Sequence, residues 1–219
     1  MKKNHLLIGV IVLILAGALG YYAWDRHQTG KLRAATLEKI TGATQSLRTL
    51  LAPAADTVAQ SQAVAAAAER VDRDLLALRA VNTSRILLLG AGADTYLHAT
   101  LELLKRQAAL LMLDSGLRHG ISAFRDHLDG NRSAPGWTST AVQQKNRLEQ
   151  DYREYRSTLD AHARIIDGLP DALKTLAPQV PEKNLVTTNE IAGLRAAVAT
   201  SAAAISTEME TLRRITAPR

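Results

Sequence analysis

The sequence contains no cysteine and only one phenylalanine. The absence of cysteine excludes disulfides, thiolate ligands for zinc or iron–sulfur clusters, a c-type haem attachment site and a cysteine nucleophile. It also excludes attachment to a membrane through a lipidated cysteine. Because only five Tyr and two Trp accompany the single Phe, a deep ligand pocket lined by aromatic side chains is not expected, although a small one is still compatible with the composition.

Strand patterns and blocks of like charge are nearly absent as well. β-branched residues do not alternate with polar residues over any useful length, whereas apolar residues recur at helical spacing almost everywhere. The formal net charge is +6, but acidic and basic residues are interleaved along the chain. This pattern is typical of solvated helical surfaces, so we expect an all-α protein with no nucleic-acid partner.

A long uncharged run is present near the N-terminus, from Leu6 to Trp24. A helix of this length extends about 28 Å, close to the thickness of the hydrocarbon core of a bilayer. Tyr21, Tyr22 and Trp24 lie at its C-terminal end, where aromatic side chains favour the level of the lipid headgroups. The sequence therefore predicts a single transmembrane anchor that contacts membrane lipid through residues 6–24, with these three aromatic residues at the interface.

The segments around the anchor set its orientation. Lys2 and Lys3 precede the run, and three basic residues follow soon after it: Arg26, Lys31 and Arg33. The two sides are nearly balanced, but a short tail with two lysines usually stays in the cytoplasm. We therefore expect a protein of the bacterial inner membrane with a cytoplasmic N-terminus and a periplasmic C-terminal domain; a domain that faces the cytoplasm is the alternative.

A cleaved signal peptide is the competing interpretation of the same run. Ala18 and Gly20 are small enough to precede a cleavage site. The length of the run and the aromatic cluster after it argue for retention. The expected organisation is thus a tail at 1–5, the anchor at 6–24, a juxtamembrane connection at 25–36 and a helical domain at 37–216.

Apolar seams divide the domain into four helical segments. The first is expected over residues 30–81 with a bend at Pro53, and the second from Ser84 to residue 128, loosened near Gly90 and Gly92. The third is expected from Trp137 to a stop at Gly168 and Pro170, and the fourth begins with a capping box formed by Thr187 and Glu190. Four long helices with short connections predict an antiparallel four-helix bundle with coiled-coil-like seams. In that topology the C-terminus returns to the anchor, and the Asp129–Gly136 loop lies beside the membrane.

The sequence carries no recognisable catalytic or metal-binding signature. No Glu has a His three positions later, as helical metal sites of the ferritin type require, and the common nucleophile motifs are absent. We therefore expect no enzyme activity, no cofactor and no metal. The candidates for contact with a ligand or a partner are aromatic or imidazole side chains of the third segment: Trp137, Tyr152, Tyr155 and His162. The alternative for Tyr152, Tyr155 and His162, which lie on the apolar seam, is a place in the helical core.

Two functions follow from this organisation. The first is an accessory or scaffolding subunit of a membrane or envelope complex, whose helical domain contacts another protein or a second copy of the chain. The alternative is an extracytoplasmic four-helix bundle that senses a small molecule and signals through a partner. In general architecture, a span followed by a long-helix bundle, the chain resembles the sensor domains of bacterial chemoreceptors, although no specific motif carries this resemblance.

Overall fold

The computed structural model describes residues 2–52, 57–130 and 132–216, with side chains described from residue 17 onward. This part of the chain consists of helices and short connections, without strands, which confirms the predicted all-α class. The elements are five α-helices and two short 3-10 helices, namely α1 (Lys2–Thr49), α2 (Thr57–Arg79), η1 (Thr83–Ile86), α3 (Leu87–Asp129), α4 (Trp137–Lys174), η2 (Glu182–Asn184) and α5 (Thr188–Ile215).

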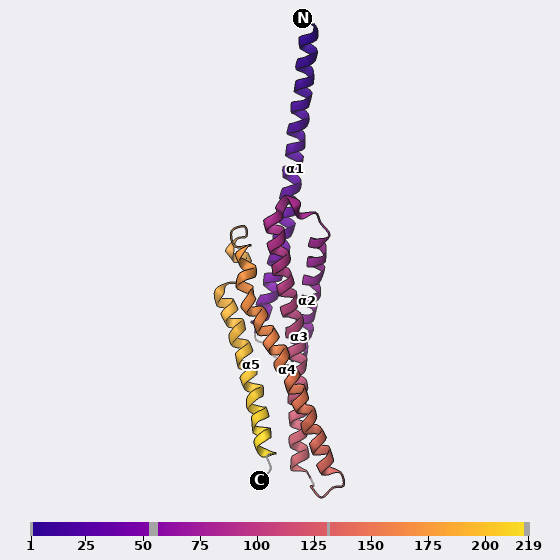
Figure 1. Cartoon of the computed structure of the whole chain (residues 1–219), viewed down its shortest axis with the longest axis vertical. Coiled ribbons are helices and arrows are strands. Elements are labelled where there is room, and N and C mark those ends of the chain that lie inside the picture. The colour runs from indigo at the N-terminus through magenta and orange to yellow at the C-terminus, as the bar shows by residue number, and fades with distance from the viewer. Residues whose placement is uncertain (1, 53–56, 131, 217–219) are drawn as a thin grey trace.

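Helix α1 is continuous over 48 residues and projects from the rest of the molecule at its N-terminal end (Figure 1). The expected connection at 25–36 is therefore part of the same helix as the apolar run. Much of that run, residues 6–16, lies outside the residues whose side chains are described. Within the described residues no single helix meets the length and hydropathy criteria for a membrane span, whereas α2 and the Thr83–Asp129 segment, bent by 102° at their junction, meet them together.

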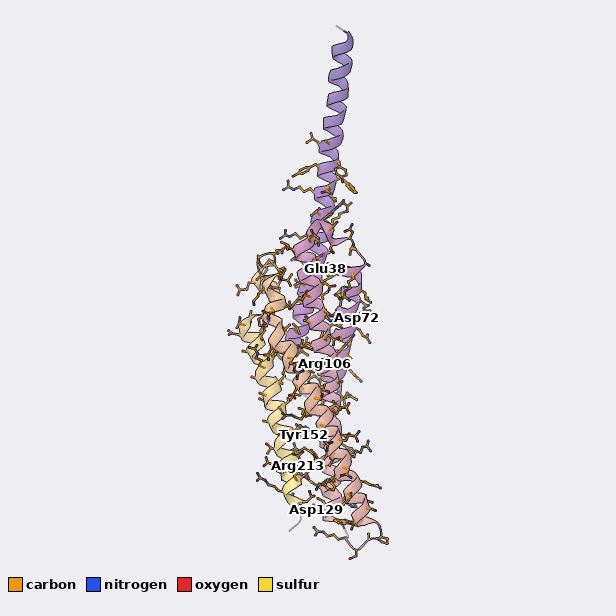
Figure 2. All side chains as sticks on the ribbon, in the orientation of Figure 1. Glu38, Asp72, Arg106, Asp129, Tyr152 and Arg213 are labelled. Carbon is orange, nitrogen blue, oxygen red and sulfur yellow. The ribbon has the colours of Figure 1, made fainter. Side chains whose placement is uncertain are left out.

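Successive helices run in alternating directions along the long axis, as predicted, but there are five of them and not four (Figure 1). The difference arises near Pro53, where a reversal separates α1 from α2 instead of a bend; Pro53 itself lies outside the described residues. The extra reversal places the C-terminal end of α5 opposite the N-terminus. The predicted positions of the connections are therefore wrong: η1 lies beside the projecting helix, and the loop after Asp129 lies at the far end (Figures 1 and 2).

The core is divided into two clusters along the rod. The first, which we call the proximal core, lies nearer the N-terminal projection and takes buried residues from all five helices. The second, the distal core, contains residues of α3, α4 and α5 only. The apolar seams of the third and fourth predicted segments supply much of both clusters. In α2 Val58 is exposed, and the buried face includes Val64, Val71, Leu75 and Leu78.

Gly90 and Gly92 serve close packing in α3, which is unbroken where the sequence predicted loosening. A Cβ atom on Gly90 would lie 2.8 Å from Thr83 Cβ, and one on Gly92 would lie 2.9 Å from Leu176 Cδ2. The two glycines thus let η1 and the segment after α4 approach α3. Asp94, two residues after Gly92, forms an ion pair with Arg79 of α2 (Nε–Oδ1 2.6 Å).

The helix boundaries agree with the sequence at several points and differ at others. The capping box at Thr187 and Glu190 is present, and the Asn82 side chain accepts a hydrogen bond from the Ser84 backbone. Helix α4 begins at Trp137 after Gly136, whose φ of 79° suits glycine. It continues through Gly168 and Pro170 to Lys174, so the predicted stop at these two residues is wrong.

Candidate functional site

A cavity of about 140 Å³ lies at the junction of the proximal and distal cores. It occurs just past the end of α1, where Leu50 contributes to its wall and the space between α3, α4 and α5 is no longer filled by a fourth helix. The remaining apolar lining residues are Leu110, Leu111, Leu159, Leu194, Ala197 and Val198. The polar lining residues are Gln107, Asp114, Arg118, Tyr155, His162 and Ser201.

His162 is the most unusual side chain of this cavity. Only 1% of its surface is exposed, and its Nδ1 atom has no hydrogen-bond partner among the described residues. Burial, assisted by the positive charge of Arg106, lowers the pKa of His162 to about 4. The imidazole is therefore neutral at neutral pH, and its unpaired Nδ1 is enclosed by the surrounding side chains.

Tyr155 and an ion-pair network complete the polar side of the cavity. Burial raises the pKa of Tyr155 to about 12, so the phenol is also neutral. Arg118 joins Asp114 (Nε–Oδ2 2.8 Å) and Glu208 of α5 (Nη1–Oε1 3.1 Å). Because two carboxylates already compensate this guanidinium, the site offers hydrogen-bonding groups beside an apolar wall rather than a free charge.

The other two candidates of the third predicted segment lie elsewhere. Tyr152 faces α5, with its hydroxyl 2.6 Å from Ser206 Oγ, and the Arg213 guanidinium lies 5.4 Å from the centre of its ring (Figure 2). Trp137 lies at the start of α4 and stacks on His127 with 5.2 Å between the ring centres. Its Nε1 donates a hydrogen bond to the His127 carbonyl (2.9 Å). Tyr152 and Trp137 therefore stabilise helix contacts, and the structure brings only Tyr155 and His162 together.

The aromatic residues at the end of the apolar run form a second candidate site. Tyr21, Tyr22 and Trp24 are all exposed on the projecting part of α1. The Tyr21 and Trp24 rings are 6.1 Å apart. Arg85 of η1 lies 5.3 Å from the Trp24 ring centre and pairs with Asp25 (Nη2–Oδ1 3.0 Å), so this collar touches the body of the molecule.

Several residues of the cavity were missed in the sequence. Asp114 and Arg118 lie on the stripe of α3 that also carries Leu110 and Leu117, at positions four residues from one another. A charged pair inside such a stripe signals a polar site against a helical core. The sequence does not single out Ser201, because the alanine-rich segment around it does not indicate which face of the helix is buried.

The described side chains limit the chemistry that this arrangement supports. No group of three or more His, Asp or Glu side chains among them is placed to hold a metal ion. His162 Nδ1 has no hydrogen-bond partner among the described residues. A neutral imidazole, a neutral phenol and an apolar wall are suited to binding. Comparison with known proteins gives no match to a family model, a curated protein or a solved structure.

Proposed function

We propose that this chain is a non-enzymatic, single-pass membrane protein of the bacterial inner membrane, and that its helical rod is an accessory or scaffolding subunit of a membrane or envelope complex. Residues 6–24 anchor it in lipid, the N-terminus is cytoplasmic and the rod lies in the periplasm. The observation that carries this proposal is the exposed collar of Tyr21, Tyr22 and Trp24, which follows an uncharged run on a helix that enters the body without interruption.

The partner surface that we favour is the outer face of α5. This helix lies at one side of the rod (Figure 1). An exposed strip of small side chains runs along it at helical spacing: Ala192, Ala196, Ala199 and Ala203. Small side chains permit close approach of a second helix, from another protein or from a second copy of this chain.

The experiment is a cross-linked pull-down of the tagged full-length protein from native membranes, read by mass spectrometry. We expect a stoichiometric membrane or envelope partner that is lost when Ala199 is replaced by arginine. Ala123→Arg is the matched control, because Ala123 is an exposed alanine of α3. Recovery of the protein from the soluble fraction only, or equal loss of the partner in both variants, contradicts the proposal.

The cavity favours a second candidate function, the sensing of a small molecule. Its volume of about 140 Å³ is close to that of engineered cavities that bind benzene, roughly 150 Å³. Gln107, Tyr155 and Ser201 supply neutral hydrogen-bonding groups in its wall. The ligand class is thus a small neutral molecule, largely apolar, with one hydroxyl or N–H group.

Phenol is a suitable probe for this candidate, titrated calorimetrically into the full-length protein in detergent micelles. Ser201→Leu fills the cavity and removes binding, whereas Thr200→Leu, at an exposed neighbour outside the cavity lining, preserves it. Equal heats for the two variants would show that phenol binds elsewhere, and no heat with the unchanged protein would exclude this ligand class.

A further inference from the structure

The first turn of α3 and the connection before it present apolar side chains to the outside at the anchor end of the rod. Leu87 and Leu88 are 68% and 69% exposed, and Val81 is also exposed. In the same segment Ile86 and Leu89 are buried in the proximal core, which fixes the orientation of the turn. Two adjacent exposed leucines are not needed for packing here, because their neighbours already supply it.

This turn lies at the level of the aromatic collar. The contacts of Arg85 with Trp24 and Asp25 hold η1 against α1 at the end of the apolar run. Figure 1 shows the start of α3 beside the point where α1 leaves the body. A bilayer that contains residues 6–24 therefore has its headgroup region at the height of Val81–Leu88.

The side chains at this level have the chemistry of a membrane interface. Tryptophan and tyrosine favour the headgroup region, leucine favours the acyl boundary below it, and arginine is attracted to lipid phosphates. Arg26 is exposed on the same part of α1 and adds a second guanidinium. The combination of exposed leucines with cations fits a lipid surface better than it fits a protein groove.

We propose that Val81–Leu88 is a second membrane contact: Leu87 and Leu88 insert into the outer part of the bilayer, and Arg85 lies among the phosphates. The proposal rests on the membrane anchor proposed above. It gives the rod two points of contact with the bilayer, the helix α1 and the turn beside it. Two contacts restrict the tilt of the rod, whereas a single helix leaves the tilt free.

The absence of cysteine makes a direct test simple, because a single introduced cysteine is the only thiol. Full-length Leu88→Cys, Tyr22→Cys and Met112→Cys are labelled with an environment-sensitive fluorophore. All three positions are exposed, so labelling does not disturb the core. Each protein is reconstituted at low density into vesicles of phosphatidylcholine and phosphatidylglycerol, with or without a lipid that carries a nitroxide near the headgroup.

We expect the nitroxide lipid to reduce fluorescence at positions 22 and 88 and to leave position 112 unchanged. Loss of fluorescence at 22 but not at 88 overturns this inference and leaves the anchor intact. No loss at either position overturns both. Blue-shifted emission at 88 that ignores the nitroxide and rises with protein density overturns the inference in favour of a second copy of the chain.

Discussion

The proximal and distal halves of the rod are stabilised in different ways. In the proximal half the Thr44 hydroxyl joins Tyr96 Oη and the Asn184 carbonyl, both at 2.8 Å, in a buried polar contact between α1, α3 and the connection before α5. Arg48 adds an ion pair with Glu190. The distal half consists of three helices linked by ion pairs at the surface, such as Arg213 with Glu149. From this comparison we expect the half that contains α1 to resist unfolding more than the three-helix half beyond its end.

Charge insertion into each core gives the largest expected effect. Leu97 in the proximal core and Leu117 in the distal core are both buried. An unpaired aspartate at either site costs about 3 to 5 kcal/mol, because the charge loses water without gaining a partner. We expect Leu97→Asp to unfold the whole domain and Leu117→Asp to remove hydrogen-exchange protection mainly from the distal half. Unchanged thermal midpoints would show that the assigned cores are wrong, and equal loss of protection in both variants would abolish the distinction between the halves.

Lowering the pH is expected to destabilise the junction of the proximal and distal cores through protonation of His162. Its pKa is about 4 in the folded protein against 6.5 ordinarily, so the unfolded chain binds more protons between these values. The free energy of unfolding therefore falls as the pH decreases from 6.5 towards 4, by up to about 3 kcal/mol. We expect the free energy of unfolding of His162→Gln, measured with urea at several pH values, to lack this part of the pH dependence.

The control for that measurement is His119→Gln, since His119 is exposed. Hydrogen bonds from arginine lower the pKa of three carboxylates, Asp94, Glu149 and Glu190, and these contribute equally in all the variants. The two histidine variants should thus differ only through His162. Parallel pH profiles would exclude a buried neutral imidazole.

Glycine-to-alanine substitutions in the two halves are expected to change the free energy of unfolding by about 1 kcal/mol each, in opposite directions. Alanine at Gly90 gains helix propensity but places its Cβ 2.8 Å from Thr83 Cβ, which is tied to the backbone of η1. We expect net destabilisation of about 1 kcal/mol from overpacking. A Cβ atom on Gly116 would have no neighbouring atom within 4 Å. Gly116→Ala in the distal part of α3 should therefore stabilise the protein by up to about 1 kcal/mol. Thermal unfolding of the two variants shows whether they shift in opposite directions.

Ion-pair removal gives the smallest effects. Arg48 also donates from Nη2 to the Leu185 carbonyl (3.2 Å), so Arg48→Met leaves several groups without partners. Arg213 is more exposed than Arg48. We therefore expect Arg213→Met to lower the free energy of unfolding by less than about 1 kcal/mol, and this loss should disappear at high salt. Chemical denaturation at two salt concentrations measures both. A larger loss of unfolding free energy for Arg213→Met than for Arg48→Met would contradict the expectation that the proximal half is the more stable one.

Helical class, most helix ends and much of the core could be predicted, because the seams through Leu148–Leu169 and Ile191–Leu212 repeat over many turns and each turn reinforces the register. The reversal near Pro53 could not, since a proline is compatible with a kink or with a chain reversal. One missed reversal inverted the expected position of every later connection. His162 and Tyr155 were found as seam residues, but a seam does not reveal that a helix elsewhere ends and leaves a space beside them.

The continuity of α1 has a mechanical consequence. From Trp24 to Thr49 the helix is a single shaft of roughly 38 Å. Its lower end leads directly to Leu50 in the cavity wall, and its upper end carries the aromatic collar. No helix break therefore separates the wall of the cavity from the collar, and the two ends of this shaft keep a fixed orientation relative to each other.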